Sequence, residues 1–430
     1  MKFSHQTRDF AIGSIPVIGN RENGSIIGLD KDGKTYVEAL RENPGREPRN
    51  EKEKQLHQAL LSGHFLVEDG AEGEAEDKGG IVSAYLHVTQ NCNLHCVGCY
   101  SYNKDRNASD DADTEKMKLA IRRLCRAGLK TLVISGGEPF LRKDLPELLR
   151  TARDGGVERL DIITNGTVLD KEKLLAVKPY VDTIAVSVDG FSAEHDHYIR
   201  DEGIFDAVTR SIQLLKSLGM TVSVLPTVHR KNCEYMDDYV AYARGLGAEI
   251  SFSLLTCPPY SQDDEERNKK EEREESLSSY LFNDEQLRFI GDKLTHLGQE
   301  GIRVLDSPQD INFSCSRSCG VCRNICSVGF DGSVYPCHML HYEELILGNI
   351  FENDLEDIMR TGKAQQIRSI DVDTFTGCKD CIHKNLCGGG CRARSYFKYG
   401  DFRSHDFYCP MTMDFFNRAS KLLNDMYGEK

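Results

Sequence analysis

Three cysteines lie close together early in the chain, spaced so that their thiols can share one metal site. Cys92, Cys96 and Cys99 follow a Cys-x3-Cys-x2-Cys pattern within YLHVTQNCNLHCVGCYSYN. Three thiolates on one short loop can bind three corners of a cubic iron–sulfur cluster and leave the fourth iron open. A zinc site with His95 or His87 as its fourth ligand fits the same spacing. The triplet alone therefore predicts a metal site and leaves the metal undecided.

A second group of cysteines lies near the other end of the chain. Nine of the 16 cysteines fall between positions 315 and 391, and Cys409 follows them. From position 378 onward the spacing is Cys-x2-Cys-x5-Cys-x3-Cys-x17-Cys, and residues 322–337 add Cys-x9-Gly-x4-Cys. A long chain without an export signal favours reduced thiolates over disulfides. This group therefore predicts further metal loops, with zinc knuckles as the alternative to iron–sulfur clusters.

The residues between the two cysteine groups alternate between strand and helix patterns. Strands rich in β-branched residues are expected at 85–90, 131–137, 159–165, 183–190, 221–228 and 249–255. Helical periodicity is expected at 115–128, 145–156, 204–219 and 235–247. Such alternation predicts a parallel sheet with functional residues at the carboxyl ends of its strands. Six units predict an α/β fold, a partial (β/α)6 TIM-like barrel.

Composition divides the chain into parts. The stretch VEDGAEGEAEDKGG is acidic, Gly-rich and unable to bury a core, so it predicts a flexible linker. Before it, strands are expected at 10–19, 24–30 and 64–68, and helices at 34–43 and 51–63. A dense mixed-charge run at 261–279 predicts a solvated segment. The predicted parts are a module at 1–66, the linker at 67–80, the barrel at 81–256, a bridging region at 257–310 and a Cys-rich domain at 311–430.

Charge and hydropathy limit the partners. The formal net charge of −14 argues against nonspecific nucleic-acid binding. No run approaches the 18–20 apolar residues of a membrane span, and MKFSHQTRDF lacks the apolar region of a signal peptide. We therefore expect a cytoplasmic protein with no nucleic-acid partner and no membrane partner.

The motif SGGEP, at 135–139, follows the second predicted barrel strand. Together with the cysteine triplet it resembles the radical S-adenosylmethionine superfamily, and the resemblance covers about residues 84–255. It implies that S-adenosylmethionine chelates the open iron of a [4Fe-4S] cluster and is cleaved by one electron to a 5′-deoxyadenosyl radical. Gly136 and Gly137 would allow close backbone approach to this ligand, and Glu138 would accept hydrogen bonds from its amino group.

Further residues match positions where the family contacts the ribose, the carboxylate or the substrate. Two of these residues, at 165 and 189, also begin good Asx–Gly turn dipeptides. In this family an aromatic residue usually precedes the third cysteine and packs on the adenine, whereas this chain has Gly98 there. We expect Tyr100 to take over that contact. The matching positions are Asn165, Ser187, Asp189 and Arg200.

The C-terminal cysteine spacing and the LGNI motif at 347–350 resemble the SPASM domain, a twin-cluster extension of enzymes that modify peptides and proteins. The resemblance implies a distal auxiliary cluster, a nearer one and, with the triplet, three [4Fe-4S] clusters. Cys326 and one of Cys315 or Cys319 stay unassigned, and Cys322 against Cys326 is itself a choice. The implied distal ligands are Cys378, Cys381, Cys387 and Cys409. The implied nearer ligands are Cys322, Cys337 and Cys391, with Cys315 or Cys319 as the fourth.

The order of elements in the N-terminal module resembles the winged-helix leader-recognition element of ribosomal-peptide maturases. An exposed strand there would add the leader as an extra strand, and a stabilising cap is the alternative. The resemblance implies a precursor peptide with a leader as substrate and a flavodoxin- or ferredoxin-type electron donor. The first choice of reaction is a thioether between a substrate cysteine sulfur and a carbon, as in sactipeptide or ranthipeptide maturases.

Three alternatives remain. The first is a carbon–carbon cross-link in the same kind of substrate. The second is an anaerobic sulfatase maturase that forms formylglycine. Those enzymes typically lack the 80-residue extension and carry an acidic residue where this chain has His338. The third is a non-enzymatic electron-transfer or zinc-stabilised binding protein, against which the GGEP motif at a strand end argues.

Overall fold

The computed structural model of the chain describes most, but not all, of the 430 residues. Most of the predicted linker, most of the mixed-charge run, Arg200 and Cys257 lie outside the described residues. The described ranges are 1–68, 80–96, 98–101, 106–108, 110–192, 203–256, 277–305, 307–308 and 313–427.

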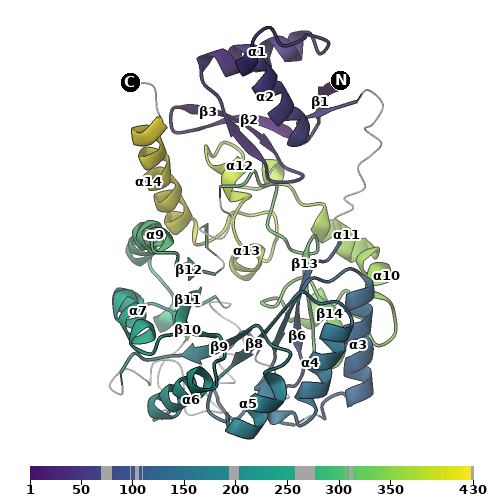
Figure 1. Cartoon of the computed structure of the whole chain (residues 1–430), viewed down its shortest axis with the longest axis vertical. Helices are drawn as coiled ribbons and strands as arrows, with labels where there is room; N and C mark the ends of the chain where they lie inside the picture. Colours follow the sequence, from purple (N-terminus) through teal and green to yellow (C-terminus); the bar gives the residue numbers. More distant parts are fainter. Residues whose placement is uncertain are drawn as a thin grey trace.

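A parallel sheet organises the lower half of the molecule in the view of Figure 1. Seven neighbouring strands run in chain order and pair in parallel. The first six confirm the six predicted strands, and their alternating buried residues explain the strand pattern. The strands are β6 (Ser83–His87), β7 (Thr131–Ser135), β8 (Arg159–Thr164), β9 (Thr183–Val188), β10 (Val222–Val228), β11 (Glu249–Leu254) and β12 (Arg303–Val304).

Helices cover the outer face of this sheet (Figure 1). The four predicted helices are present, each within a few residues of its predicted bounds. Helix α5 was not predicted, because its seven residues are too few to show a clear helical period. Its start is marked by Asp170, whose side chain accepts a hydrogen bond from the Lys173 N–H. The helices are α3 (Thr114–Arg126), α4 (Leu145–Asp154), α5 (Lys171–Val177), α6 (Phe205–Ser217) and α7 (Met236–Gly245).

The Cys-rich C-terminal part extends the same sheet. Strand β13 (Ile325–Val328) pairs in parallel with β6. Strands β14 (Ser333–Tyr335) and β15 (Gly348–Asn349) then add antiparallel pairs. The helices that follow the barrel are α9 (Asp284–Gln299), α10 (Leu355–Met359), α11 (Gly362–Arg368), α12 (Lys384–Cys387), α13 (Arg392–Tyr399) and α14 (Cys409–Tyr427).

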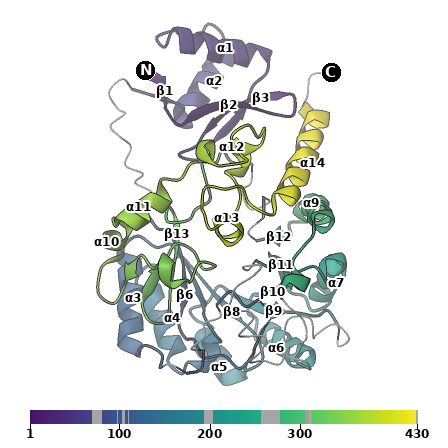
Figure 2. The same ribbon diagram turned by 180° about the vertical axis from the view of Figure 1, so that it is seen from behind.

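The N-terminal residues form a separate small unit above the sheet (Figure 2). The stretch expected as one strand at 10–19 is instead a hairpin that turns at Gly13, whose φ of 62° suits glycine. A core of its own surrounds Ile18 and Tyr36. The elements are β1 (Lys2–Phe3), β2 (Thr7–Ile12), β3 (Ile15–Asn20), β4 (Ile26–Gly28), α1 (Lys31–Glu42), α2 (Glu51–Ser62) and β5 (Leu66–Val67).

The N-terminal unit is packed onto the rest of the chain. Ile12 and Val17, on the β2–β3 hairpin, belong to the main hydrophobic core rather than to the small N-terminal one. At the same contact, the Ser14 N–H donates to Oδ1 of Asn424 on α14 at 2.9 Å. The hairpin therefore has one face in each core.

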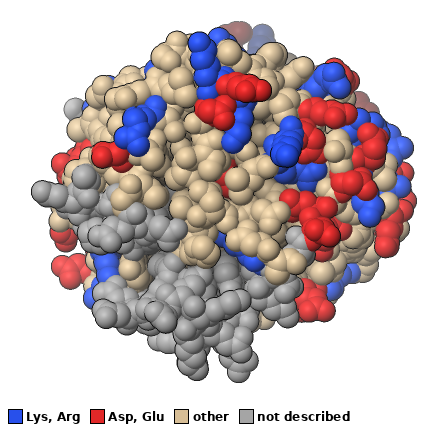
Figure 3. Space-filling view, turned by 90° about the horizontal axis from the view of Figure 1, so that it is seen from below, with Lys and Arg blue, Asp and Glu red and all other residues tan. Residues whose placement is uncertain are grey.

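Charges of both signs are interspersed at the surface. On the face shown in Figure 3, Lys and Arg side chains lie beside Asp and Glu around the rim, and much of the centre is uncharged. Within the described ranges, no helix is long and apolar enough to cross a membrane.

Buried imidazole rings join β6 to the C-terminal extension of the sheet. The rings of His87 and His341 stack at 4.2 Å between centroids, and Tyr335 stacks on the other face of His341 at 4.1 Å. Burial lowers the pKa of His87 from 6.5 to about 3, and burial also lowers the pKa of His341 well below 6.5. Both rings are therefore neutral in the folded protein near neutral pH.

The lowered pKa values of His87 and His341 predict that the free energy of unfolding falls as the pH falls. A folded-state pKa below the unfolded value means that the unfolded chain binds more protons below about pH 6.5. Each histidine should lower the free energy of unfolding by about 0.8 kcal/mol between pH 8 and pH 6. We expect the difference in the free energy of unfolding between pH 8 and pH 6 to be smaller in His341→Phe than in the wild type, as measured by anaerobic urea unfolding. The exposed His296→Gln change should leave that difference unaltered, and an unaltered difference in His341→Phe would contradict the prediction.

Candidate functional site

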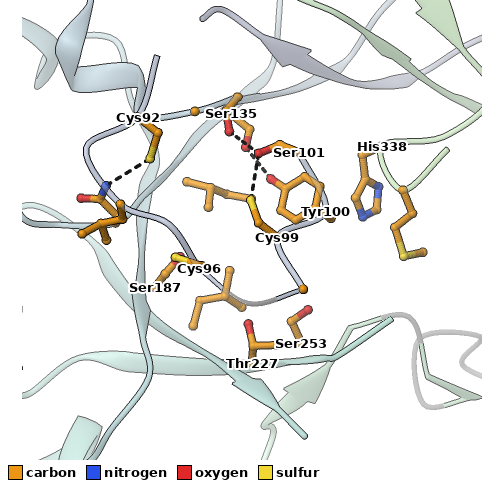
Figure 4. A pocket seen from close by; sticks show the side chains of 18 of the residues that line it. Cys92, Cys96, Cys99, Tyr100, Ser101, Ser135, Ser187, Thr227, Ser253 and His338 are labelled. Atoms are coloured by element: carbon orange, nitrogen blue, oxygen red, sulfur yellow. Dashed lines mark hydrogen bonds between the residues drawn. The ribbon is translucent and has the colours of Figure 1, made fainter. Parts of the chain in front are cut away.

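A cavity opens at the carboxyl ends of the barrel strands (Figure 4). It measures about 1140 Å³, counting space open to solvent. Cys92, Cys96 and Cys99 form one wall, and Ser187, Thr227 and Ser253 come from the ends of β9, β10 and β11. The C-terminal extension closes another side with His338 and Met339. Three thiols, polar strand ends and open space occur together here, as the sequence predicted for a cluster with a bound ligand.

Side chains hold the cysteine loop in place at Cys92. The side chain of Asn107 accepts from the Cys92 N–H at 2.8 Å and donates to the Cys92 carbonyl at 3.0 Å. On the other side, Nδ2 of Asn165 lies 3.8 Å from the Cys92 sulfur. Burial raises the pKa of the Cys92 thiol. A buried thiol of this kind becomes a thiolate when a metal cation compensates the charge.

An arginine that the sequence analysis missed lies beside the same thiols. Nη2 of Arg106 is 3.5 Å from the Cys99 sulfur and donates to the Ser101 carbonyl and hydroxyl. Burial alone would lower the pKa of Arg106, but the neighbouring thiols raise it. Its positive charge offsets part of the negative charge of three thiolates. Nothing in the sequence distinguishes this arginine from a surface one.

The backbone explains the missing aromatic residue. Gly98 has a φ of 65°, a left-handed conformation that L side chains rarely adopt. Two positions later, the Tyr100 ring borders the cavity and its hydroxyl bonds to the Ser135 hydroxyl at 2.5 Å. Burial raises the pKa of Tyr100 to about 12, so its hydroxyl stays protonated and uncharged near neutral pH. Its role toward adenine stays a prediction.

The GGEP motif holds the cysteine loop as well as facing the cavity. A Cβ on Gly137 would lie 2.1 Å from the carbonyl oxygen of Asn91, directly before Cys92. A Cβ on Gly136 would lie 2.4 Å from the carbonyl oxygen of Thr89. Both glycines therefore let the end of β7 pack against the start of the loop. Their predicted contact with S-adenosylmethionine stays a prediction.

Glu138 lies fully buried beneath the cavity wall. Its carboxylate accepts from the Thr164 hydroxyl at 2.8 Å and from the backbone N–H of Asn165 at 2.8 Å. These bonds fix the end of β8, where Asn165 borders the cavity. The predicted bond from Glu138 to the amino group of S-adenosylmethionine is a further contact that no observation here tests.

The other predicted residues separate into groups. Asn165 and Ser187 border the cavity. Asp189 is buried beside it, with Oδ1 3.9 Å from Nε2 of the buried His229, and is not among the residues that line the cavity. Arg200 lies outside the described residues. Thr227 and Ser253 were missed, although their place at strand ends follows the same rule that selected Ser187.

Four C-terminal cysteines surround a second, smaller cavity. Its volume is about 370 Å³, counting space open to solvent, and its lining also includes Lys384, His405 and Asp406. Four thiols around one space are the donors that an iron–sulfur cluster takes. The four are the predicted distal ligands, Cys378, Cys381, Cys387 and Cys409.

A buried ion pair supports this second cavity. Arg394 and Asp406 are each about 2% exposed and meet at 2.7 Å. Asp406 also accepts from the backbone N–H of Cys391 at 2.8 Å. Burial would raise the pKa of Asp406, but Arg394 and these bonds lower it, so the carboxylate stays charged. The pair thereby positions the backbone of Cys391 next to the cavity that the four predicted distal ligands line.

The cysteines assigned to the nearer site differ in their surroundings. Cys319 lies near Cys322, and burial together with Cys319 raises the pKa of Cys322 to about 12. Cys315 instead packs against the N-terminal unit, where a Cβ on Gly19 would lie 2.6 Å from its sulfur. Cys326 sits on β13, fully buried in the main core. The Cys337 sulfur lies 3.5 Å from Nδ1 of His338.

Two known family models match this chain, one in the barrel and one in the Cys-rich C-terminal part. Residues 86–243 match the model of the Radical SAM superfamily, and residues 319–382 match that of an iron–sulfur cluster-binding domain, SPASM. An AdoMet-dependent heme synthase from Methanosarcina barkeri is 28% identical over 339 residues, 75% of this chain and 94% of that protein. Mycofactocin maturase MftC from Mycolicibacterium smegmatis is 28% identical over 318 residues, 72% of this chain and 78% of that protein.

Solved structures share the fold. The protein anSMEcpe with bound AdoMet gives a TM-score of 0.64 at 21% identity, covering 80% of this chain and 98% of its own. SuiB from Streptococcus suis, bound to its precursor peptide SuiA, gives 0.60 at 15% identity, covering 95% of this chain and 99% of its own.

Fold, cysteine sites and family matches define the class of the protein. The chain is a radical S-adenosylmethionine enzyme with a C-terminal SPASM domain. It has the α/β partial barrel of that class, and its cofactors are [4Fe-4S] clusters and S-adenosylmethionine.

The contact of Gly137 with the loop leads to a prediction. In Gly137→Ala the new methyl group must displace the backbone before Cys92, and misplacement by about 1 Å can cost about 100-fold in rate. We expect 5′-deoxyadenosine release to fall by that order, with less iron bound. Gly245→Ala is the matched control, since nothing lies within 4 Å of a Cβ there. After anaerobic reconstitution, iron analysis measures the bound iron and chromatography measures 5′-deoxyadenosine release in both variants. Equal release rates in Gly137→Ala and Gly245→Ala would contradict the prediction.

Proposed function

We propose that this enzyme is a maturase of ribosomally made peptides that forms a Cys sulfur-to-carbon thioether. The observation that carries the proposal is the N-terminal unit, packed onto the SPASM domain and presenting a groove. The SuiB fold match supports it, because 95% coverage must take in this unit. The heme synthase and MftC are equally identical to this chain, so identity alone does not choose the substrate.

The groove is suited to an extended peptide. It lies beside β4, which within the described residues pairs only with β3, so β4 is an edge strand. Ile15, Ile26 and Leu423 give it an apolar floor, and Lys31 and Lys34 add positive charge. We propose that a leader adds a strand to β4 here, which main-chain hydrogen bonds would stabilise.

The charge of the barrel cavity favours a peptide over a porphyrin. A porphyrin substrate carries carboxylates that need cationic partners. Among the described residues that line the cavity, Arg106 is the one Lys or Arg, and it already bonds to the cysteine loop. Modification of a porphyrin is the second candidate, favoured by the 94% coverage of the heme synthase. A carbon–carbon cross-link and formylglycine formation remain alternatives within the peptide class.

The bound cofactors would supply a 5′-deoxyadenosyl radical for hydrogen abstraction. The reaction removes one hydrogen atom from a substrate carbon, then one proton and one electron as the substrate sulfur bonds to that carbon. Ser187, Thr227 and Ser253 would bind the substrate backbone or S-adenosylmethionine by hydrogen bonds. The apolar side chains of Leu225 and Leu254 would exclude water from the radical. The nearer auxiliary cluster would accept the electron.

We further propose three clusters, with Cys319 as the fourth ligand of the nearer auxiliary one. Its proximity to Cys322 supports this choice, and the contact of Cys315 with Gly19 speaks against the alternative. The electron donor would be a flavodoxin or ferredoxin. The residues proposed to bind S-adenosylmethionine are Gly136, Gly137, Glu138, Asn165, Ser187, Asp189, Arg200 and Tyr100.

The ligand assignment predicts different iron contents for two variants. Cys319→Ser should lose the nearer auxiliary cluster or change its spectrum, because an oxygen ligand replaces a sulfur. Cys315→Ser should keep all its iron. Iron analysis and electron paramagnetic resonance of the dithionite-reduced proteins measure both, and the reverse pattern would assign the fourth ligand to Cys315.

The proposed reaction predicts a mass loss of two hydrogens in a precursor peptide. The reconstituted enzyme, S-adenosylmethionine and dithionite should yield this product and consume one iodoacetamide-reactive thiol per cross-link. Mass spectrometry separates the alternatives, since a carbon–carbon bond consumes no thiol.

The double charge reversal Lys31→Glu/Lys34→Glu should weaken leader binding, whereas Lys54→Glu, on the same unit but outside the groove, should not. Modification of an iron coproporphyrin instead of a peptide would overturn the proposal.

A further inference from the structure

Arg21 is a fully buried cation between the N-terminal unit and the SPASM domain. It follows β3, and its side chain has no exposed surface. Its guanidinium donates to both carboxylate oxygens of Asp373, at 2.6 and 3.2 Å, and to Asp371 at 3.3 Å. It also donates to Oδ1 of Asn385 at 2.5 Å. A planar guanidinium with four such bonds fixes both orientation and distance between the parts it joins.

One partner of Arg21, Asn385, lies within the distal cysteine loop, and the other two, Asp371 and Asp373, lie on the turn just before it. Asn385 and its neighbour Lys384 lie on α12, the four-residue helix that follows Cys381 and ends at Cys387. Lys384 borders the distal cavity and also pairs with Asp373 at 3.0 Å. Two consecutive residues of one short helix therefore contact the Arg21 network while the cysteines on either side of them face the cluster space.

The loop after α12 has little intrinsic rigidity. Gly388, Gly389 and Gly390 all have left-handed φ angles, from 61° to 85°. Glycine loses more conformational freedom on folding than any other residue, so three in a row make this loop costly to order. Ligation of Cys387 and Cys381 to one cluster would restrict the loop and hold α12 in place.

We propose that Arg21 couples the N-terminal unit to the distal auxiliary site, so that a filled site stabilises the docked unit and the docked unit retains the cluster. The coupling rests on the proposed distal ligand set. If the unit captures the leader as proposed above, a chain without its distal cluster also positions its substrate poorly. Coupling of this kind is reciprocal, because each event must favour the other by the same free energy.

The experiment uses both directions of the coupling. In Arg21→Met, chelator-driven loss of the distal cluster should speed up several-fold while the first cluster is lost at the wild-type rate. In Cys381→Ser, which lacks a distal ligand, amide hydrogen exchange in β2 and β3 should speed up several-fold. Arg41→Met is the matched control, since Arg41 pairs with Asp9 inside the N-terminal unit. It should change neither measurement.

Two results would overturn the coupling. One is faster amide exchange in β3 of Arg21→Met together with iron loss at the wild-type rate. Arg21 would then hold the N-terminal unit without affecting retention of the distal cluster. The other is unchanged exchange in Cys381→Ser. If that variant does not fold, exchange in wild-type protein after stepwise iron removal gives the same answer. No measurement here uses a peptide, so failure of the coupling and failure of the peptide function give different results.

Discussion

The parallel pairing of β13 with β6 fixes the position of the two cysteine-rich parts relative to each other. Strand β6 leads directly into the loop of Cys92, and β13 leads through β14 to Cys337. Tyr85 on β6 consequently stacks on His338 at 4.1 Å between ring centroids. The cavity between the barrel and the SPASM domain therefore depends on one set of backbone hydrogen bonds, and its width does not depend on a flexible domain interface.

Much of the barrel was predictable because its signals are local. Each strand carries its own run of buried β-branched residues, and the cysteine triplet and GGEP follow two of these strands directly. The pairing of β13 with β6 joins residues more than 200 positions apart. The four residues of β13 are too few to show a pattern that would predict this pairing. Arg106 was missed for the same reason, because only the folded loop distinguishes it from other arginines.

The site also shows where a residue type is explained by backbone conformation. Gly98 departs from the family pattern, and its left-handed φ shows that this loop bends where an aromatic residue would be strained. The surroundings of the cysteines differ as well, since Cys326 packs in the core and Cys315 packs against Gly19. The SPASM resemblance implied the four cysteines that line the distal cavity, whereas the proposal of Cys319 over Cys315 rests on the fold.

Helix α14 connects two places treated separately above. It begins at Cys409, packs along α9, and near its far end Asn424 accepts the Ser14 N–H of the N-terminal hairpin. Its 19 residues span about 28 Å at 1.5 Å per residue. A tilt of about 5° at its first turn moves the other end by about 2 Å, more than a hydrogen bond tolerates. A small rotation at Cys409 would thus become a displacement at the N-terminal hairpin.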